Sequence, residues 1–155
     1  MLFAEYPDMF MEDAANFGAG ESGSDAGNPH GGSRPAVLIV EDEQISRRAL
    51  KTLLASCGFS TESAESAEQA LQLLDDLKQR PGPHIALVDL NLPGMNGLEF
   101  ISRLCQLDPA AVPVLMTATG DDALAAALRG HTVPYLRKPL DFDRLLSVIE
   151  EKSRN

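Results

Sequence analysis

From residue 36 onward, short apolar runs alternate with stretches of helical periodicity, and this alternation restricts the possible fold more than any other feature of the chain. Strand and helix patterns that alternate in this way are typical of βα units. Such units connect through right-handed crossovers, which make the strands parallel and place helices on both faces of the sheet. The sequence therefore predicts an α/β fold with a doubly wound, five-stranded parallel sheet.

The borders of the elements follow from apolar runs, from Gly and Pro, and from helix-capping residues. The predicted strands are 36–40, 59–63, 84–89, 114–117 (opened by Pro113) and 133–136. The predicted helices are 44–57, 67–77, 97–107, 121–129 and 142–149. We expect helix caps at Ser66 (in a capping box with Gln69), at Asp121 or Asp122, and at Asp141, and a buried face on the last helix made of Phe142, Leu145, Leu146 and Ile149.

The chain divides near Arg34 into an N-terminal extension, residues 1–35, and one domain, residues 36–155. Residues 18–35 contain six Gly, three Ser and two Pro, which is typical of a linker. Residues 1–17 hold four of the eight aromatic residues, at spacings that suit a short amphipathic helix at 6–17. Two interpretations stay open for this segment: a frayed extension without a role, or a docking peptide.

Composition excludes several classes of function. The net charge of −10 argues against direct DNA binding, which needs clustered Lys and Arg. No apolar run reaches transmembrane length, and the first residues lack the basic region of a secretory signal, so we expect no membrane insertion. Cys57 and Cys105 form no C-x-x-C pair and fit buried free thiols in a reducing compartment. The expected location is the cytoplasm.

Chemically distinctive residues stand where the predicted strands end. They are Glu41 and Asp42 after the first strand, Asp89 at the end of the third, Thr117 and Ala118 at the fourth, and Lys138 after the fifth. Because sites in parallel α/β sheets lie beyond the carboxyl ends of the strands, we expect these residues to meet. Three carboxylates without a cation would repel one another, so the group predicts a hard divalent ion, with Mg²⁺ the best fit.

Such a site suits phosphoryl transfer. A Mg²⁺ ion that keeps several waters leaves positions for phosphoryl oxygens, and Asp89 is then the nucleophile that attacks phosphorus. The Lys138 ammonium and the Thr117 hydroxyl would share the charge of the transferred group. The small side chain of Ala118 leaves room for that group.

Four motifs, in this order, resemble the receiver domain of two-component response regulators over about residues 36 to 152. They are Val-Glu-Asp-Glu (40–43), Val-Asp-Leu-Asn-Leu-Pro-Gly-Met-Asn-Gly (88–97), Met-Thr-Ala (116–118) and Tyr-Leu-Arg-Lys-Pro (135–139). The resemblance implies a flavodoxin-like fold with strand order 2-1-3-4-5 and a cis Lys138–Pro139 peptide. Position 41 departs from the family pattern, in which Asp is commoner.

The resemblance also implies the roles of the site residues. Asp89 would accept phosphate from a histidine kinase or a histidine phosphotransfer protein. Mg²⁺ would be held by Asp42, Asp89, the Asn91 carbonyl and, through water, Glu41. Thr117 and Tyr135 would be the switch residues. Further phosphate contacts would come from Asn91, Thr117, Ala118 and Lys138.

We therefore expect a phosphoacceptor switch that is not an enzyme. No residues remain after the last predicted helix for an output domain, so the signal would pass through a surface to a downstream protein. One alternative is a small Mg²⁺-dependent phosphohydrolase with an aspartyl-phosphate intermediate, although Asn91 stands where its general acid would be needed. A second is a scaffold that is not phosphorylated.

Several residues also have plain structural interpretations. Asp42 could cap the first helix, and Tyr135 could be ordinary packing at the edge of the sheet. Arg47, Arg48 and Lys51 are expected on a solvated helix face. His30, His84 and His131 show no partner spacing, so we expect no metal or catalytic role for them.

Overall fold

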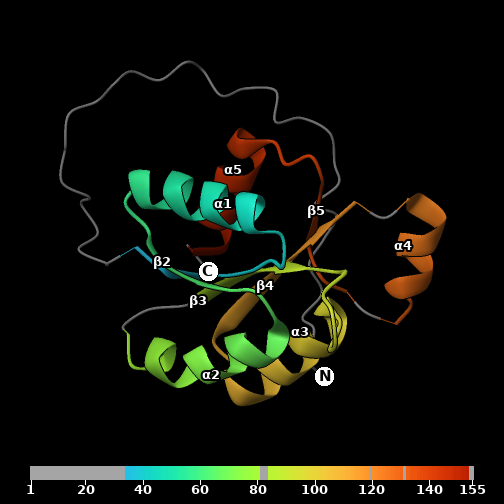
Figure 1. Ribbon diagram of the computed structural model, residues 1–155, viewed down its shortest axis with the longest axis horizontal. Coiled ribbons are helices and arrows are strands. Elements are labelled where there is room, and N and C mark those ends of the chain that lie inside the picture. Colours follow the sequence, from blue (N-terminus) through green and yellow to red (C-terminus); the bar gives the residue numbers. More distant parts are fainter. Residues whose placement is uncertain (1–33, 81–83, 119, 131, 154–155) are drawn as a thin grey trace.

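The computed structural model describes residues 34–80, 84–118, 120–130 and 132–153 (Figure 1). The predicted helix at 6–17 and nearly all of the predicted linker lie outside the described residues. The same holds for His30 and His131.

The described chain contains five strands and five helices in strict alternation. The strands are β1 (Ala36–Val40), β2 (Ser60–Ala64), β3 (His84–Asp89), β4 (Ala111–Thr117) and β5 (Tyr135–Arg137). The helices are α1 (Gln44–Ser56), α2 (Ala67–Lys78), α3 (Gly97–Leu107), α4 (Asp121–Ala127) and α5 (Phe142–Ser153).

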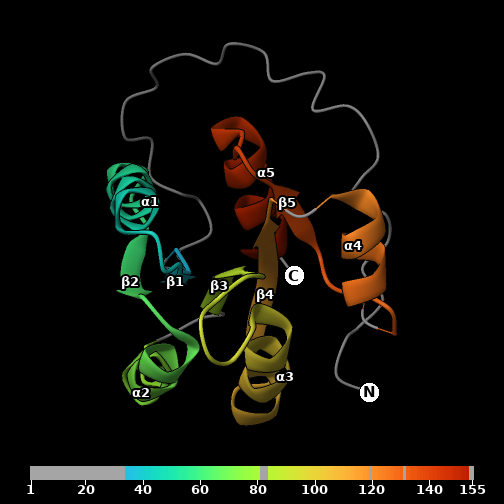
Figure 2. The ribbon, with the colours of Figure 1, turned by 45° about the vertical axis from the view of Figure 1, so that its right-hand side comes forward.

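All strand pairs are parallel, and the sheet order is β2-β1-β3-β4-β5. Both the predicted fold class and the order implied by the family resemblance are confirmed. Helices α1 and α5 lie on one face of the sheet, and α2 and α3 lie on the other (Figures 1 and 2). The direction of winding reverses between β1 and β3, so the topological switch point lies where these two neighbouring strands end.

The sheet has a separate apolar core on each face. Along β1, Val37 and Ile39 pack in the cluster with α1 and α5, whereas Leu38 and Val40 pack in the cluster with α2 and α3. Every residue of β1 and β3 is buried, because helices cover both faces of these strands. This double burial explains why their sequences are continuous apolar runs rather than alternating ones.

Two prolines account for the largest differences between the predicted and the observed strand borders, and β2 is shifted by one residue, to Ser60–Ala64. β4 begins at Ala111, and Pro113 lies inside it, because β5 joins β4 only from Leu115 onward. A residue without an N–H is tolerated where one side of the strand has no neighbour. β5 begins at Tyr135, two residues later than predicted, since Pro134 cannot donate to the ladder. The Pro134 carbonyl still accepts a hydrogen bond of 2.8 Å from the Leu115 N–H.

The helix caps agree with the prediction in part. Asp141 caps α5, as predicted, by accepting from the N–H groups of the first turn. The cap of α1 is Glu43, whose carboxylate accepts from the Ser46 N–H at 2.6 Å. These cap hydrogen bonds lower the pKa of Glu43. Because Glu43 occupies the cap position, the alternative of Asp42 as the cap is wrong. α4 begins after Gly120 without a side-chain cap, so the predicted Asp cap is wrong.

The apolar face of α5 is shorter than predicted. Leu145 and Ile149 are buried and Leu146 is half-buried, but the side chain of Phe142 is 47% exposed. Phe142 is the first residue of α5 and lies beyond the strand ends, where there is no sheet surface for it to cover. Its predicted burial is therefore wrong.

A buried pair of polar side chains, His84 and Asp108, lies at the end of β3 opposite to Asp89. His84 Nδ1 and Asp108 Oδ2 are 3.0 Å apart, and both side chains are 8% exposed. Asp108 follows α3, and its other oxygen accepts from the Ala110 N–H. In the sequence, no residue near His84 stands at a spacing that marks a partner. This contact was not predicted because Asp108 is distant from His84 in the sequence.

The two cysteines are free, and both are half-buried rather than buried. Burial, with a contribution from the negative charge of Asp108, raises the pKa of the Cys105 thiol. None of the helices in the described ranges has the length and apolar character needed to cross a membrane.

We expect Asp108→Ala to lower the free energy of unfolding by about 1–3 kcal/mol, because His84 would keep its buried position and lose its partner. Urea denaturation measures the change. The matched control is Glu99→Ala, which removes an ion pair with Arg103 whose side chains are 53% and 55% exposed. That control should change stability by less than about 0.5 kcal/mol. Equal effects of the two substitutions would contradict a stabilising role for the buried pair.

Candidate functional site

Parallel pairing brings two acidic residues to the same edge of the sheet. Glu41 directly follows β1, and its N–H continues the ladder by donating to the Ala64 carbonyl at 3.1 Å. Asp89 is the last residue of β3 and pairs with Met116 of β4. Glu41 is fully buried and Asp89 is 5% exposed. The backbone therefore holds two carboxylates side by side at the switch point, with little access to water.

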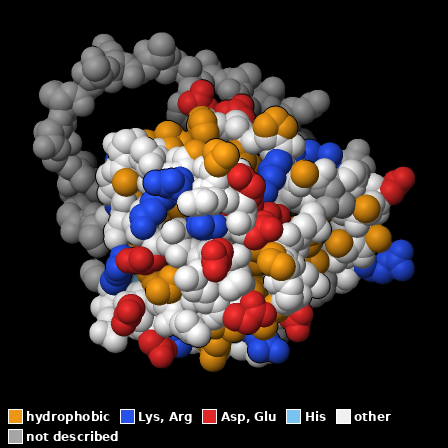
Figure 3. All heavy atoms as spheres, viewed as in Figure 1, with side chains coloured by type: hydrophobic (Ala, Val, Ile, Leu, Met, Phe, Trp, Pro, Cys, Tyr) orange, Lys and Arg blue, Asp and Glu red, His pale blue; other side chains and the backbone are white. Residues whose placement is uncertain are grey.

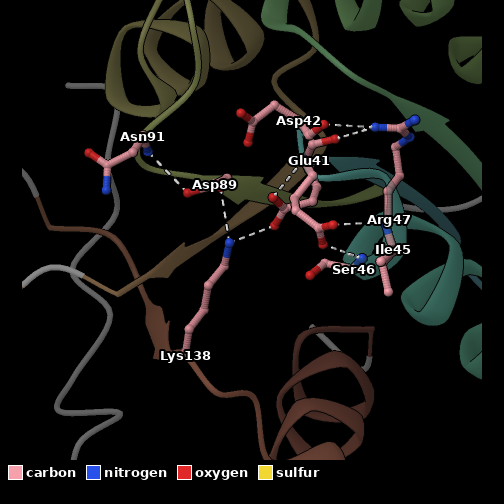
Figure 4. A network of polar contacts seen from close by, with 9 residues as sticks. Glu41, Asp42, Ile45, Ser46, Arg47, Asp89, Asn91 and Lys138 are labelled. Carbon is pink, nitrogen blue, oxygen red and sulfur yellow. Dashed lines mark hydrogen bonds and ion pairs between the residues drawn. The ribbon is translucent and has the colours of Figure 1, made fainter.

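Lys138, which directly follows β5, reaches across the strand ends to both carboxylates (Figure 4). Its Nζ lies 2.7 Å from Glu41 Oε2 and 3.0 Å from Asp89 Oδ2. The Lys138 N–H also donates to the Thr117 carbonyl at 2.8 Å, which joins β4 to the residue that carries the ammonium. The Lys138–Pro139 peptide is cis, as predicted.

The second oxygen of each buried carboxylate accepts from a nearby backbone N–H. The Asn91 N–H donates to Asp89 Oδ1 at 3.0 Å, and the Glu43 N–H donates to Glu41 Oε1 at 3.2 Å. The side chain of Asn91 points away from the two carboxylates (Figure 4). Both carboxylates are thus oriented by hydrogen bonds before any ligand arrives, and the contribution of Asn91 to the site comes from its backbone.

Asp42 completes a cluster that suits a hard cation. Oxygens of Glu41, Asp42 and Asp89 all lie within 4.8 Å of one another, and the side chain of Asp42 is the exposed member. Within the described ranges, this is the one group of three or more candidate ligands at such spacing. Three carboxylates with one side open to solvent fit Mg²⁺, which binds through a few carboxylates and keeps several waters.

The electrostatics of the pocket favour a cation. Burial, together with the negative charge of Asp89, raises the pKa of Glu41, and the hydrogen bond from Lys138 opposes this rise only in part. Burial alone would lower the pKa of Lys138, but its hydrogen bonds with Glu41 and Asp89 raise the pKa above its usual value. Lys138 therefore stays charged, and one ammonium does not fully compensate the acidic cluster.

Arg47 has a contact that sequence reasoning missed. It was expected on a solvated face of α1, but it is half-buried. Its guanidinium donates to the carbonyls of Glu41 and Asp42 at 2.9 Å and 3.3 Å. The expectation for Arg47 is therefore wrong, and Arg47 instead holds the backbone that carries two of the three acids. No local pattern marks such a contact.

Gly97 also supports the site without an assigned chemical role. A Cβ atom at this first residue of α3 would overlap the Asp89 carbonyl oxygen and lie 2.9 Å from Leu90 Cα. The Gly97 N–H donates to the Leu90 carbonyl at 3.0 Å. The start of α3 thus packs directly on the backbone that positions Asp89, and only Gly allows this approach.

The remaining predicted residues lie around the same edge. Thr117 is fully buried at the end of β4, one residue past the partner of Asp89, and Ala118 follows it at the surface. Tyr135 opens β5, is half-buried, and packs against the apolar cluster on the α2 and α3 face. The structure therefore places the predicted metal and phosphate residues at or next to the carboxyl ends of the strands, whereas Tyr135 lies at the start of β5.

The fold and the site define an α/β domain with an acidic, lysine-bridged pocket at the topological switch point. The sequence model of the family described as "Response regulator receiver domain" matches residues 37–150. The chain belongs to this family. The family resemblance drawn from the sequence is thereby confirmed, and the chain is a receiver domain of the kind used in two-component signalling.

Two curated relatives and one solved structure illustrate the similarity. The chain is 36% identical over 121 residues to the positive alginate biosynthesis regulatory protein of Pseudomonas aeruginosa, covering 76% of this chain and 47% of the relative. It is 32% identical to a cyclic di-GMP phosphodiesterase of Thermotoga maritima, covering 77% and 31%. A response regulator receiver protein from Pseudomonas putida superposes with a TM-score of 0.65 at 29% identity, covering 77% of this chain and 98% of the other. The chain thus spans less than half the length of these curated relatives.

We expect Gly97→Ala to lower the free energy of unfolding by at least about 2 kcal/mol, because the new methyl group would collide with backbone atoms. Urea denaturation measures the change. Gly120→Ala is the matched control, since a Cβ atom there meets nothing within 4 Å. The control should cost about 0.5–1 kcal/mol, roughly the difference between Gly and Ala at a helix N-cap. Similar losses at both positions would contradict the packing argument.

Proposed function

We propose that the chain is a phosphoacceptor switch in which Asp89 takes a phosphoryl group from a histidine kinase or a histidine phosphotransfer protein. The observation that carries the proposal is the contact of Lys138 with a buried Asp89 beside two further carboxylates. A lysine that already bridges to the nucleophile is in place for the negative charge of an arriving phosphoryl group. Membership of the receiver family supports the same role.

The proposed reaction is an in-line transfer. A carboxylate oxygen of Asp89 attacks phosphorus, the bond from phosphorus to the donor nitrogen of phosphohistidine breaks, and the donor histidine keeps the electron pair and takes up a proton. The product is an aspartyl phosphate. Lys138 then has phosphoryl oxygens within reach in place of Asp89 Oδ2, and its ammonium offsets part of their charge.

Mg²⁺ is the proposed cofactor, held by Asp42, Asp89 and the Asn91 carbonyl, with Glu41 through water. When bound, the ion neutralises charge on the phosphoryl oxygens. Thr117 and Ala118 are proposed to border the transferred group, the first through its hydroxyl and the second through its small size. The raised pKa of Glu41 supports this assignment, because a nearby divalent charge would relieve the unfavourable burial of the anion.

Phosphorylation would then change a surface that a downstream protein reads. Thr117 and Tyr135 are the proposed switch residues, and Tyr135 lies on β5, the strand at the edge of the sheet. The free cysteines are typical of a reducing compartment and support the cytoplasm as the place of action. We further propose that the described domain works by binding rather than by turnover of a substrate.

We expect Asp89→Asn to abolish covalent labelling by acetyl phosphate with Mg²⁺, because the nucleophile is lost. Lys138→Ala should slow labelling by about 10²-fold, since one charge that stabilises the transferred group is removed. Mass spectrometry of the intact chain measures the adduct. Matched controls are Asp75→Asn and Lys78→Ala on the exposed face of α2, which should label like the wild type.

The same measurement separates the alternative functions. A persistent, base-labile adduct on Asp89 supports the switch. Rapid turnover of phosphate esters with no lasting adduct would instead indicate the Mg²⁺-dependent phosphohydrolase. Absence of both would indicate the scaffold that is not phosphorylated. Undiminished labelling of the Asp89→Asn variant would overturn the site assignment.

We expect Mg²⁺ to stabilise the fold more at about pH 8 than at about pH 5, because a proton on Glu41 competes with the cation. A raised carboxyl pKa means that the metal-free fold loses stability as pH rises from about 4.5 toward that pKa. Mg²⁺ should reverse this loss, by about 2.7 kcal/mol at a concentration of 100 times its Kd. Thermal unfolding with and without Mg²⁺ measures the effect, and Asp42→Asn should reduce it. A response to Mg²⁺ that is equal at both pH values would contradict the prediction.

A further inference from the structure

A cleft of about 300 Å³ lies between α1 and the start of α5, beside the acidic site. Glu41 and Lys138 form the part of its wall that it shares with the site. The rest of the cleft is largely apolar. It is lined by Ser46, Ala49, Leu50, Pro139, Leu140 and Phe142.

Large apolar side chains stand exposed at the rim of this cleft. Ile45 is 78% exposed and Phe142 is 47% exposed, and they are two of the three large hydrophobic residues that are exposed in the described part of the chain. Ile45 and Ala49 are four residues apart and share one face of α1. An apolar cleft with an apolar rim is typical of a docking surface rather than of plain protein surface.

The helix beside the cleft is basic, although the chain as a whole is acidic. α1 carries three basic residues and no acidic one, and Arg48 and Lys51 are exposed. Figure 3 shows Lys and Arg side chains over α1 and hydrophobic side chains between α1 and the start of α5. The acids at the rim, Glu43 and Asp141, accept from backbone N–H groups as helix caps. The surface therefore suits a partner that is both apolar and acidic.

Residues 1–17 have this complementary composition. They contain four acidic residues and no basic one, which gives a charge of −4 against the +3 of α1. They also contain Phe3, Tyr6, Phe10 and Phe17, which are half of the aromatic residues of the chain. Aromatic side chains are the usual anchors of a short docking segment.

The covalent connection is long enough for this contact within one molecule. Sixteen residues, 18–33, precede Arg34 and can span at most about 55 Å. The five residues of β1 separate that point from the cleft by only about 17 Å. A tethered segment of this reach has an effective concentration in the millimolar range, so even weak intrinsic affinity gives substantial docking.

A second cleft, which is larger than the first, fits the segment less well. It lies between α3 and α4, has a volume of about 740 Å³, and includes Asn91, Asn96, Glu99 and Ser102 in its lining. None of the described residues that line it is basic, and Glu99 is acidic, whereas the lining of the cleft between α1 and α5 includes Lys138 as well as Glu41. Charge therefore favours the cleft between α1 and α5.

We propose that residues 1–17 dock within the same molecule on the cleft between α1 and α5. The aromatic side chains contact Ile45 and Phe142, and the acidic side chains face Arg48 and Lys51. This inference goes beyond the proposed phosphoacceptor role and does not depend on it.

The test compares two full-length chains by amide chemical shifts and hydrogen exchange. The variant replaces the four aromatic residues by alanine: Phe3→Ala, Tyr6→Ala, Phe10→Ala and Phe17→Ala. We expect shift changes in α1 and at residues 140–142, and a fall in amide protection there of about twofold to tenfold. The matched control repeats the comparison with Ile45→Ala and Phe142→Ala added to both the wild type and the aromatic variant. In this background, the four aromatic substitutions should no longer change the shifts or the protection of these amides.

Each of the following outcomes would contradict the proposal. Unchanged amides in α1 would mean that the segment does not dock, and changes confined to the cleft between α3 and α4 would place it elsewhere. Shift changes that grow with protein concentration would indicate docking on a second copy instead.

A charge variant, Arg48→Glu with Lys51→Glu, should reduce amide protection in α1 and at residues 140–142. An unchanged protection would also count against the proposal. Acetyl phosphate labelling of both full-length chains should stay equal, which separates this test from that of the phosphoacceptor role.

Discussion

The contact of one ammonium with two buried carboxylates is the interaction on which the site depends. Lys138 Nζ lies within 3.0 Å of oxygens from both Glu41 and Asp89. Two anions with so little access to water would destabilise the fold if they were left without a partner. The ammonium of Lys138 offsets part of the negative charge of the two carboxylates but does not neutralise it, since the pKa of Glu41 stays raised. A partly compensated anionic cluster of this kind favours the binding of a cation.

The parallel sheet separates this cluster from the parts of the domain that maintain stability. Apolar side chains on both faces form the core, and the buried contact of His84 with Asp108 lies at the opposite end of β3. The reactive edge is instead built from strand ends and the residues that follow them. In the proposed function, a change in charge at this edge would shift loops and surfaces without unpacking the sheet, which is the physical requirement for a reversible switch. Arg47 and Gly97 connect the two regions by holding backbone rather than by taking part in the chemistry.

Much of the fold could be predicted because its signals are local. Continuous apolar runs mark β1 and β3, and the Ser66 cap and the Gly97 start of α3 are visible as short patterns. The errors arise where a contact with a distant element decides the outcome. Pro113 stays inside β4 because β5 is short, and Phe142 is exposed because the sheet ends before it.

The sequence by itself determined the class of fold, the strand order through family resemblance, and the residues that gather at the strand ends. These depend on periodicity and on parallel topology, which act along the chain. Only the tertiary structure decided which oxygens Lys138 contacts, that Arg47 holds the Glu41 backbone, and that His84 has a buried partner. Such contacts depend on how side chains from different parts of the chain pack together in three dimensions. Their geometry therefore leaves no pattern in the sequence.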